Sequence, residues 1–292
     1  MKWVLPALAL VAACAGASDK PAQPRASPAL WKIGDADTEI YLFGTIPVLP
    51  DGLSWRTPDI DKALARSREL VVEVEDLDDE RKTAETFLRL AVSEGLPPVS
   101  QRVPENRRAG LEALREKSGV PSTVLDRFET WAVAVTLSSG VLKTLDVSPR
   151  NGVDRKLKEE FSRRRRPVIA LETTEQQLGA FDRLTEGAQR AFLVNMVDEA
   201  ADPKAEFDRM IRAWGSGDEK GIALSFEDEA ALTPELTDAL LKNRNREWTE
   251  WLVNRLRQPG VVMVAVGAGH LAGDRSVQSM LAGRGIVVSR VQ

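Results

Sequence analysis

Short apolar runs alternate with longer amphipathic stretches along most of the chain. Five of these runs are rich in branched side chains, which is typical of strands. We predict strands at 39–46, 69–75, 167–172, 261–269 and 286–292. Between them, apolar residues recur at helical spacing. One such segment, "TPDIDKALARS", starts with a threonine cap followed by proline, as many helices do.

The order of these elements predicts the fold class. Strands lie near both ends of the chain and once in the middle, and two long helical stretches separate them. We expect residues 121–140, in the first stretch, to form one helix that ends at a glycine. We therefore predict an α/β fold with a central, mostly parallel β-sheet, flanking helices and two long helical excursions that form a cap. A single domain is expected over 29–292, after a signal segment at 1–14 and a polar, proline-rich tether at 15–28.

The N-terminal residues have the pattern of an export signal. Lys2 precedes the apolar stretch "WVLPALALVAA", which is too short to cross a bilayer and is followed by Cys14, the only cysteine. This pattern is similar to a bacterial lipobox, in which the cysteine carries the lipid. An ordinary signal peptide cut after Ala15 or Ala17 is the alternative. We expect a lipoprotein anchored to a membrane of the bacterial cell envelope and facing the periplasm.

The charge balance excludes one class of partner. Lysine and arginine total 40 and aspartate and glutamate 44, so the net charge is −4, unlike the strongly positive charge of a nucleic-acid binder. We therefore expect no nucleic-acid partner. A peptide, a small molecule and an envelope protein all stay open as partners, besides the membrane itself through the lipid anchor.

Polar residues and glycines follow four predicted strands at their carboxyl ends, where the ligands of parallel sheets gather. They are Gly44, Thr45 and Pro47 at the first strand, Glu73, Glu75 and Asp76 at the second, Glu172 and Gln176 at the third, and Gly267, Gly269 and His270 at the fourth. His270 is the only histidine of the chain. If these ends converge, a histidine, carboxylates and glycine amides share one pocket. This combination suits a general acid–base pair or a site for a hard metal ion.

Each of these features also has a purely structural explanation. Acidic residues after a strand often cap the next helix, and Gly267 and Gly269 could serve only a tight turn. A lone histidine is commonly structural, but His270 follows a Gly-x-Gly turn at the end of an apolar strand, which favours a functional role. The four arginines at 163–166 are typical of a solvated helix end, with a phosphate or membrane-surface role as the alternative.

Several segments together resemble the TraB/GumN family, which includes the animal Tiki proteins. The matching segments are, in order, "LWKIGDADTEIYLFGTIPVLPDGL", "LVVEVE", "NGVDRKLKEEFSRRRRPVIALETTEQQLGAFDRL", "NRNREWTEWL" and "VMVAVGAGHLAGDRSVQSMLAGRGIVVSRV". The resemblance runs from about Ala29 to the C-terminus. It implies an α/β core with helical additions, as in the erythromycin-esterase and ChaN-like group. It also implies a metal-dependent protease whose site uses two Gly-x-x-His motifs and an acidic residue.

The resemblance maps the family's site onto this chain residue by residue. The second Gly-x-x-His motif falls on Gly267 and His270, and the acidic residue falls on Glu73. The family's arginine falls on Arg244, followed by Asn245 as a binding residue. The resemblance thus implies His270, Glu73 and Arg244 as catalytic residues. His270 and Glu73 would be the ligands if a metal binds.

The first motif departs from the family pattern, because Pro47 stands three residues after Gly44 where a histidine is expected. Proline offers neither an acid–base group nor a metal-ligand atom in its side chain. Another carboxylate, such as Glu172, could still complete a site. We therefore expect an impaired, hydrolase-like pocket that binds its ligand without efficient turnover, with a divalent metal weakly held or absent. A working peptidase or esterase that uses His270 and Glu73, with or without a metal, is the alternative, and an envelope scaffold with an unused pocket is a third.

Overall fold

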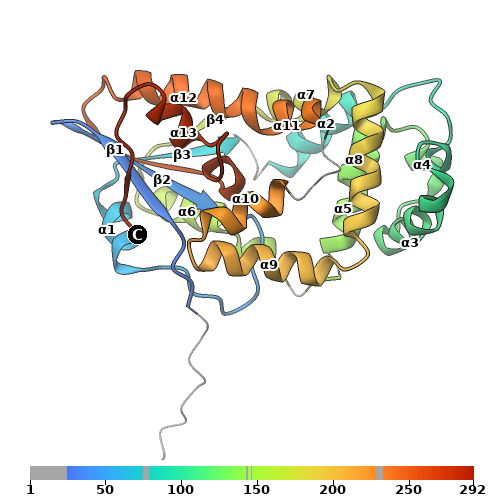
Figure 1. Cartoon of the computed structure of the whole chain (residues 1–292), viewed down its shortest axis with the longest axis horizontal. Helices are drawn as coiled ribbons and strands as arrows, with labels where there is room; N and C mark the ends of the chain where they lie inside the picture. The colour runs from blue at the N-terminus through green and yellow to red at the C-terminus, as the bar shows by residue number, and fades with distance from the viewer. Residues whose placement is uncertain (1–24, 75–78, 143, 146, 228–232) are drawn as a thin grey trace, which may run out of the picture.

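A six-stranded sheet forms the centre of one half of the molecule (Figure 1). The computed structural model describes residues 25–74, 79–142, 144–145, 147–227 and 233–292. The strands, in the order in which they lie side by side, are β4 (Val168–Glu172), β3 (Glu69–Val74), β5 (Gly260–Gly267), β2 (Thr38–Thr45), β1 (Leu30–Gly34) and β6 (Ser289–Arg290). The first four run parallel, and β1 and β6 add two antiparallel pairings. The mostly parallel sheet confirms the predicted α/β class.

The sheet differs from the sequence prediction at its antiparallel edge and at the end of β5. Strand β1 is not predicted, because its five residues include a lysine and make a weak pattern, yet it pairs with β2 along its whole length. The expected strand at 286–292 is reduced to the two residues of β6. Strand β5 stops at Gly267, and Ala268–Leu271 forms a 3-10 turn, η5. His270 therefore lies on a turn and does not continue the strand.

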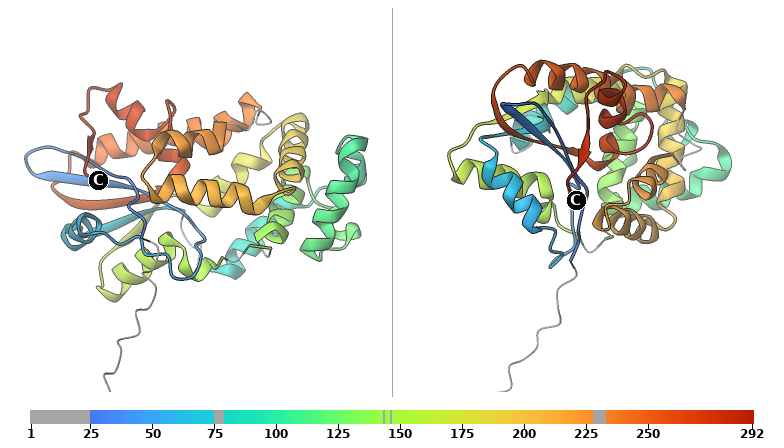
Figure 2. Two further views of the ribbon diagram at one scale, coloured as in Figure 1. Left: turned by 60° about the horizontal axis from the view of Figure 1, so that its bottom comes forward. Right: turned by 60° about the vertical axis from the view of Figure 1, so that its left-hand side comes forward.

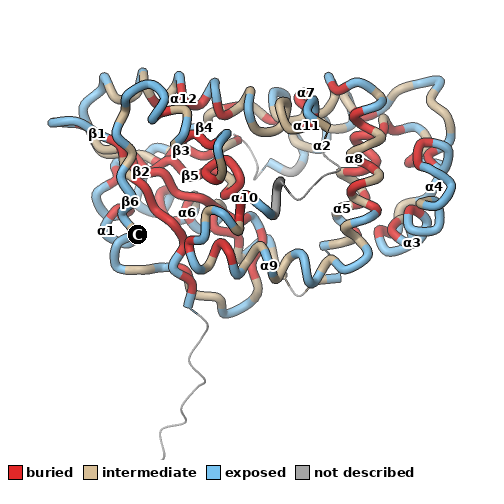
Figure 3. Tube along the Cα trace, viewed as in Figure 1, coloured by how far each residue is buried: buried red, intermediate tan, exposed pale blue. Residues whose placement is uncertain are grey.

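Alternating side chains of the strands pack into two cores, one on each face of the sheet. Tyr41 and Phe43 of β2 belong to the first core, and Ile40 and Leu42 to the second. The helices that pack on the first core are α1 (Pro58–Arg66), α6 (Val153–Arg163), α9 (Pro203–Gly215) and α10 (Glu219–Glu227). Those on the second core are α12 (Asn243–Arg255) and α13 (Val277–Ala282). Figure 2 shows the sheet between helices on both faces, and Figure 3 shows its buried strands. The two-residue period of the strands thus produces three layers.

Some helices of both helical excursions form the predicted cap, which has a core of its own, while others pack on the sheet (Figure 3). Its helices are α2 (Glu80–Ala91), α3 (Arg108–Ser118), α4 (Ser122–Leu125), α5 (Thr130–Leu142) and α8 (Glu186–Glu199), with 3-10 turns η1 (Val99–Gln101) and η2 (Glu105–Arg107). Trp131 lies fully buried in this core. Its ring stacks on Phe181 of α7 (Thr174–Asp182), with centroids 5.9 Å apart. Because α7 directly follows β4, this contact joins the cap to the edge of the sheet.

The helix expected over 121–140 is wrong, because α4 ends at Leu125 and α5 begins only at Thr130. A buried arginine holds the break, together with backbone hydrogen bonds to Ala91 and Ser93. The Arg102 guanidinium donates to the carbonyls of Asp126 and Phe128, at 3.0 and 2.5 Å. These carbonyls lie in the break and satisfy the charged side chain. Burying Arg102 without such acceptors would be costly.

The helices on the second face include a π-helical turn. Helix α11 (Pro234–Thr237) continues through η4 (Asp238–Lys242) directly into α12. In η4 the amide of Asn243 bonds to the carbonyl of Asp238, five residues earlier. Such turns insert one residue into a helix and are frequent at functional sites. No helix in the described part of the chain is both long and apolar enough to cross a membrane.

The four arginines at 163–166 are only partly a solvated helix end. Arg166 donates to carbonyls at the end of α1, those of Leu64, Ala65 and Ser67. Arg164 forms an ion pair with the buried Glu160 at 2.7 Å. Arg166 therefore links the end of α6 to the end of α1. Arg163, Arg164 and Arg165 are exposed.

Candidate functional site

The carboxyl ends of the parallel strands bring the site together. Thr45 at the end of β2 lies opposite Gly267 at the end of β5. Val74 at the end of β3 lies opposite Glu172 at the end of β4. Glu73 precedes Val74, and its carboxylate Oε2 accepts the Gly267 amide at 3.0 Å. The acidic residues of β3 and β4 and the turn that carries His270 therefore lie at one edge of the sheet.

Arg244 of α12 connects these strand ends. Its Nη2 donates to Glu73 Oε1 at 2.5 Å and also to Glu172 Oε1, and its Nε donates to Glu172 Oε2 at 3.0 Å. Its Nη1 lies 3.2 Å from His270 Nε2 and 3.1 Å from the carbonyl of Leu240, which belongs to the π turn. A guanidinium has five N–H groups. All five have an acceptor here, so Arg244 is fully engaged within the protein.

The hydrogen bonds around His270 define which nitrogen carries its proton. Asn245 Nδ2 donates to the carbonyl of Arg275 at 2.8 Å, which fixes the orientation of the amide. Asn245 Oδ1 therefore faces His270 Nδ1, at 2.6 Å, and Nδ1 must be the donor. In the neutral ring Nε2 is then an acceptor, which matches the N–H of Arg244 that faces it. Both ring nitrogens are occupied.

An indole ring holds the histidine and the arginine in place. The Trp248 ring lies 4.3 Å from the His270 ring between centroids, and the Arg244 guanidinium carbon lies 4.8 Å from the Trp248 ring centroid. Trp248 is buried, and His270 is only 5% exposed. Contacts of a guanidinium with an aromatic face are favourable when water is excluded. The packing therefore leaves His270 little freedom to turn toward solvent.

Burial and pairing shift the pKa values of the site in different directions. Burial lowers the pKa of His270 to about 4, so the imidazole is neutral near pH 7. Burial alone would raise the pKa of Glu73, but attraction to the Arg244 guanidinium and the hydrogen bond from the Gly267 amide hold it below its ordinary value. Burial raises the pKa of Glu172, and Arg244 only partly offsets this. Of the two carboxylates that share one guanidinium, Glu73 is thus the more strongly ionised.

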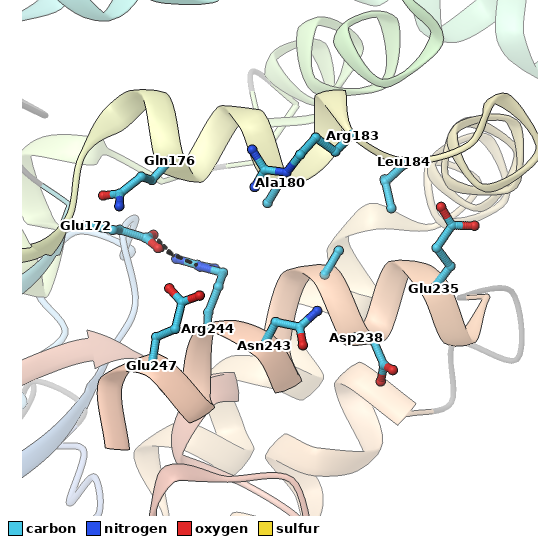
Figure 4. A pocket seen from close by; sticks show the side chains of 11 residues that line it. Glu172, Gln176, Ala180, Arg183, Leu184, Glu235, Asp238, Asn243, Arg244 and Glu247 are labelled. Carbon is cyan, nitrogen blue, oxygen red and sulfur yellow. Dashed lines mark hydrogen bonds and ion pairs between the residues drawn. The ribbon is translucent and has the colours of Figure 1, made fainter. Parts of the chain in front are cut away.

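An open cavity of about 450 Å³ adjoins this network on the side of α7 (Figure 4). Its lining residues are Glu172, Gln176, Ala180, Arg183, Leu184, Glu235, Asp238, Ala239, Asn243, Arg244 and Glu247. Gln176 and Arg183 come from α7 and its C-terminal end, and Asn243 and Glu247 come from α12 on the opposite wall. Neither His270 nor Pro47 lines this cavity. The Glu172–Arg244 pair is the part of the network that borders it.

The remaining predicted residues of the first motif lie at the same sheet edge but face other partners. Gly44 packs closely on Ala268, since a methyl group at Gly44 would lie 3.1 Å from the Ala268 Cα. The buried Trp214 of α9 donates its indole N–H to the Gly44 carbonyl at 2.8 Å. Pro47 is exposed. The carbonyl oxygen of Pro47 lies so close to Gly152 that a methyl group on Gly152 would come within 2.2 Å of this oxygen.

Two further predicted residues are described by the structure, and three are not. Gln176 accepts from the backbone amide of Thr173 in the capping box of α7, besides lining the cavity. Gly269 is buried within η5, next to His270. Cys14, together with Glu75 and Asp76, lies outside the described residues.

A third carboxyl group, Asp154, belongs to this region and is missed by the sequence analysis. It lies in the first turn of α6, which follows the 3-10 turn η3 (Pro149–Asn151), and accepts from Thr45 Oγ1 at 2.7 Å. Burial raises the pKa of Asp154 to about 6, and repulsion from Glu73 contributes. In sequence it reads only as an acid in the first turn of a helix, which is ordinary. The segment "NGVD" offers no other signal.

The donor set does not fit the divalent metal that the family resemblance implies. Within the described residues, no group of three or more His, Cys, Asp or Glu side chains is arranged to hold an ion. Nε2 of His270 and the oxygens of Glu73 and Glu172 are instead directed at the Arg244 guanidinium. The described donors of this site therefore pair with the Arg244 guanidinium.

Comparison with known proteins supports the family resemblance. "Uncharacterized protein YbaP" of Escherichia coli (strain K12) is 24% identical over 242 residues, which cover 82% of this chain and 87% of that protein. An "Uncharacterized protein" of Treponema pallidum (strain Nichols) is 22% identical over 264 residues, covering 85% of this chain and 78% of that protein. No solved structure is detectably similar. The TraB/PrgY/gumN family pattern matches residues 29–290, and the chain therefore belongs to this family.

Proposed function

We propose that this protein binds a small polar ligand in the cavity beside Arg244 and does not hydrolyse it efficiently. The observation that carries this proposal is the state of His270. Both of its ring nitrogens are hydrogen-bonded within the protein and its surface is 5% exposed. A general base must reach the proton that it removes, directly or through one water. His270 has no free nitrogen for this task.

The carboxylates do not replace the missing base. Glu73 Oε1 accepts from Arg244 and from Gln177 of α7, and Oε2 accepts from the Gly267 amide. Glu172 holds the same guanidinium through both oxygens. Pro47 contributes no side-chain donor or acceptor at the first motif. The polar groups of the site thus stabilise one another, which supports a recognition role over water activation.

The cavity offers recognition groups of several kinds. Arg183 is an exposed cation, Glu247 is an exposed carboxylate and Asn243 contributes an amide (Figure 4). A volume of about 450 Å³ lies within the range of small-molecule sites. A polar small molecule or the end of a peptide suits this lining. The ligand would contact the floor of the cavity at the Glu172–Arg244 pair.

A screen of polar small molecules and short peptides against the purified full-length chain tests this proposal. A ligand of the cavity should raise the melting temperature of the natural protein, and Arg183→Ala and Glu247→Gln should abolish that rise. Lys158→Ala, on α6 outside the cavity, serves as the matched control for loss of a cation. Ligands whose stabilisation survives both cavity variants would place binding elsewhere and refute the proposal.

A second candidate is a working hydrolase that uses His270 with Glu73. One observation favours it: His270 Nε2 lies 4.0 Å from Glu73 Oε1, so an imidazole and an ionised carboxylate form a close pair. Peptide and ester substrates incubated with the natural protein and with His270→Ala separate the two candidates. Rapid cleavage that His270→Ala abolishes would establish the hydrolase and end the binding proposal.

The same proposal includes a place in the cell. The apolar N-terminal stretch and Cys14 support lipid anchoring in a bacterial envelope, with residues 15–28 as the tether to the domain. The cavity would then face the periplasm. Its ligand would come from that compartment.

A further inference from the structure

Strand β4 forms one edge of the sheet, and its outer side has no neighbouring strand among the described residues. The exposure of its side chains reflects this position. Ile169 is 38% exposed, whereas Val71, which lies opposite it on β3, is fully buried. An uncovered strand edge is a template for pairing with another strand.

The hydrogen bonds between β3 and β4 show which backbone groups of β4 face outward. The Leu70 amide bonds to the Pro167 carbonyl at 3.0 Å. Alternate residues of a strand bond to the same neighbour, so Ile169 also turns its backbone N–H and C=O toward β3. The backbone groups of Val168 and Ala170 therefore point away from the sheet. Within the described part of the chain they have no hydrogen-bond partner.

We infer that β4 pairs antiparallel with β4 of a second copy of this chain, so that two sheets join into one across a two-fold axis. Centred on Ala170, this arrangement pairs Val168 of each copy with Glu172 of the other and forms about six backbone hydrogen bonds. The inference goes beyond the proposed function, because it concerns another surface and holds whether or not the cavity takes a ligand.

The charges that flank β4 favour an antiparallel pair of identical strands. The exposed Arg163, Arg164 and Arg165 lie at its amino end. The exposed Glu175 lies just beyond its carboxyl end. An antiparallel pair brings the arginines of each copy near Glu175 of the other, whereas a parallel pair would place two basic runs side by side. Glu175 pairs with Arg89 at 3.1 Å, and its carboxylate has acceptor sites for a second cation.

The backbone of Arg165 supports a role for its side chain. Its φ of 53° is left-handed, and among the described residues it is the only non-glycine residue with a positive φ. Glycine adopts this conformation without strain, whereas an arginine loses stability by adopting it. A contact with Glu175 of a second copy gives the exposed guanidinium a partner that the single copy does not require.

The proposed interface is small, because β4 has only five residues. Stable interfaces of standard size bury about 800 Å² on each partner, and a short strand edge buries less. We therefore expect a weak dimer with a Kd of about 10 µM. Lipid anchoring, if present, would hold both copies on one membrane and raise their effective concentration.

Sedimentation equilibrium of the full-length Cys14→Ser chain tests the inference without any contribution from a lipid. Above about 100 µM this chain should be mostly dimeric by mass action. Ala170→Pro should weaken the dimer about tenfold or more, because the hydrogen bonds between the two copies of residue 170 lose their donors. The amide of Ala170 does not bond to β3, so this variant should keep its sheet, which circular dichroism checks.

Disulfide formation tests the register of the pair. Cys14 is the only cysteine of the chain, so Cys14→Ser provides a background free of thiols. Ala170→Cys in this background should form a disulfide-linked dimer on oxidation, since directly paired residues lie about 5.5 Å apart between Cα atoms. Val287→Cys provides the matched control at a position that is 78% exposed and outside β4, and should stay monomeric.

Charge reversal keeps the inference testable even if Ala170→Pro fails to fold. Arg165→Glu and Glu175→Arg should each weaken the dimer, and both changes in one chain should restore it. A chain that stays monomeric above about 100 µM and forms no disulfide through residue 170 would overturn the inference. A dimer that none of these variants weakens would use another surface and would also overturn it. The same holds for a monomer that binds an extended peptide of residues 166–174 and loses this binding in Ala170→Pro, because the edge would then serve a peptide.

Discussion

The buried carboxyl of Asp154 should contribute less stability to this protein at neutral pH than at mildly acidic pH. Its pKa rises from 3.8 to about 6 in the folded state, chiefly through burial. The folded state thus holds a proton that the unfolded chain has already released, and folding takes up a proton between these pH values. The stability that Asp154 contributes is complete below pH 3.8 and is lost as the pH rises through 6.

The shift of about two pKa units corresponds to about 3 kcal/mol between pH 4 and pH 7. Asp154→Asn removes this titration, and its amide oxygen can still accept from the Thr45 hydroxyl, which now donates at 2.7 Å. We expect the variant and the natural protein to have similar free energies of unfolding at pH 4. At pH 7 the variant should be more stable by up to about 3 kcal/mol.

Urea denaturation from pH 4 to pH 8, followed by fluorescence of the seven tryptophans, measures this difference. Asp59→Asn provides the matched control, since Asp59 is an exposed acid in the first turn of α1. The informative quantity is the difference between each variant and the natural protein, because other carboxyl groups titrate in the same range. A difference for Asp154→Asn that does not change with pH, or that favours the natural protein at pH 7, would refute the reasoning.

Three further results are expected. Trp214→Phe removes the indole N–H that bonds to the Gly44 carbonyl, and this loss alone should lower the free energy of unfolding in urea by about 1–3 kcal/mol. An unchanged free energy would show that another hydrogen bond replaces this buried one. Pro47→His should fold with a loss of less than about 1 kcal/mol in thermal denaturation, because the side chain is exposed and proline has no backbone N–H whose hydrogen bond could be lost. A large loss of stability would mean that the proline supports the turn. Labelled palmitate should be incorporated into the natural protein in bacterial cells but not into Cys14→Ser, and a soluble, unlabelled natural protein would end the lipoprotein proposal.

The sequence predicts the strand ends of the site well, because the rule behind them is simple. Parallel strands carry their carboxyl ends to one edge, so Glu73, Glu172 and the turn with His270 are expected to meet without any knowledge of the cap. The same reasoning cannot find Arg244, which lies in a helix more than 70 residues from Glu172 in the chain. Only the family resemblance identifies it. Long-range pairing of this kind leaves no local pattern.

Other features escape the sequence because their causes are tertiary. Asp154 reads as an ordinary first-turn acid until the burial of its carboxyl beneath Thr45 is known. The break between α4 and α5 depends on Arg102, which reaches it from an earlier segment. Both ring nitrogens of His270 are hydrogen-bonded only because Asn245 and Arg244 lie on either side of the ring. Periodicity describes which face of an element is apolar, but it does not reveal which partner fills a buried polar site.

The π turn before α12 has a consequence for how this chain tolerates insertions and deletions. Each residue of an α-helix advances the helix by about 1.5 Å and turns it by about 100°. Loss of one residue within Asp238–Lys242 would let the π turn relax to a regular α-helix and would leave α11 and α12 in nearly the same angular phase, because the wide turn absorbs one extra residue. Loss of a residue within α12 before Arg244 has no such outlet and would rotate the preceding segment by about 100°. Either α11 would then leave its contacts with α8, or Arg244 would leave the two carboxylates. Chains that share this site should therefore differ in length by one residue at the π turn more readily than elsewhere in this helix.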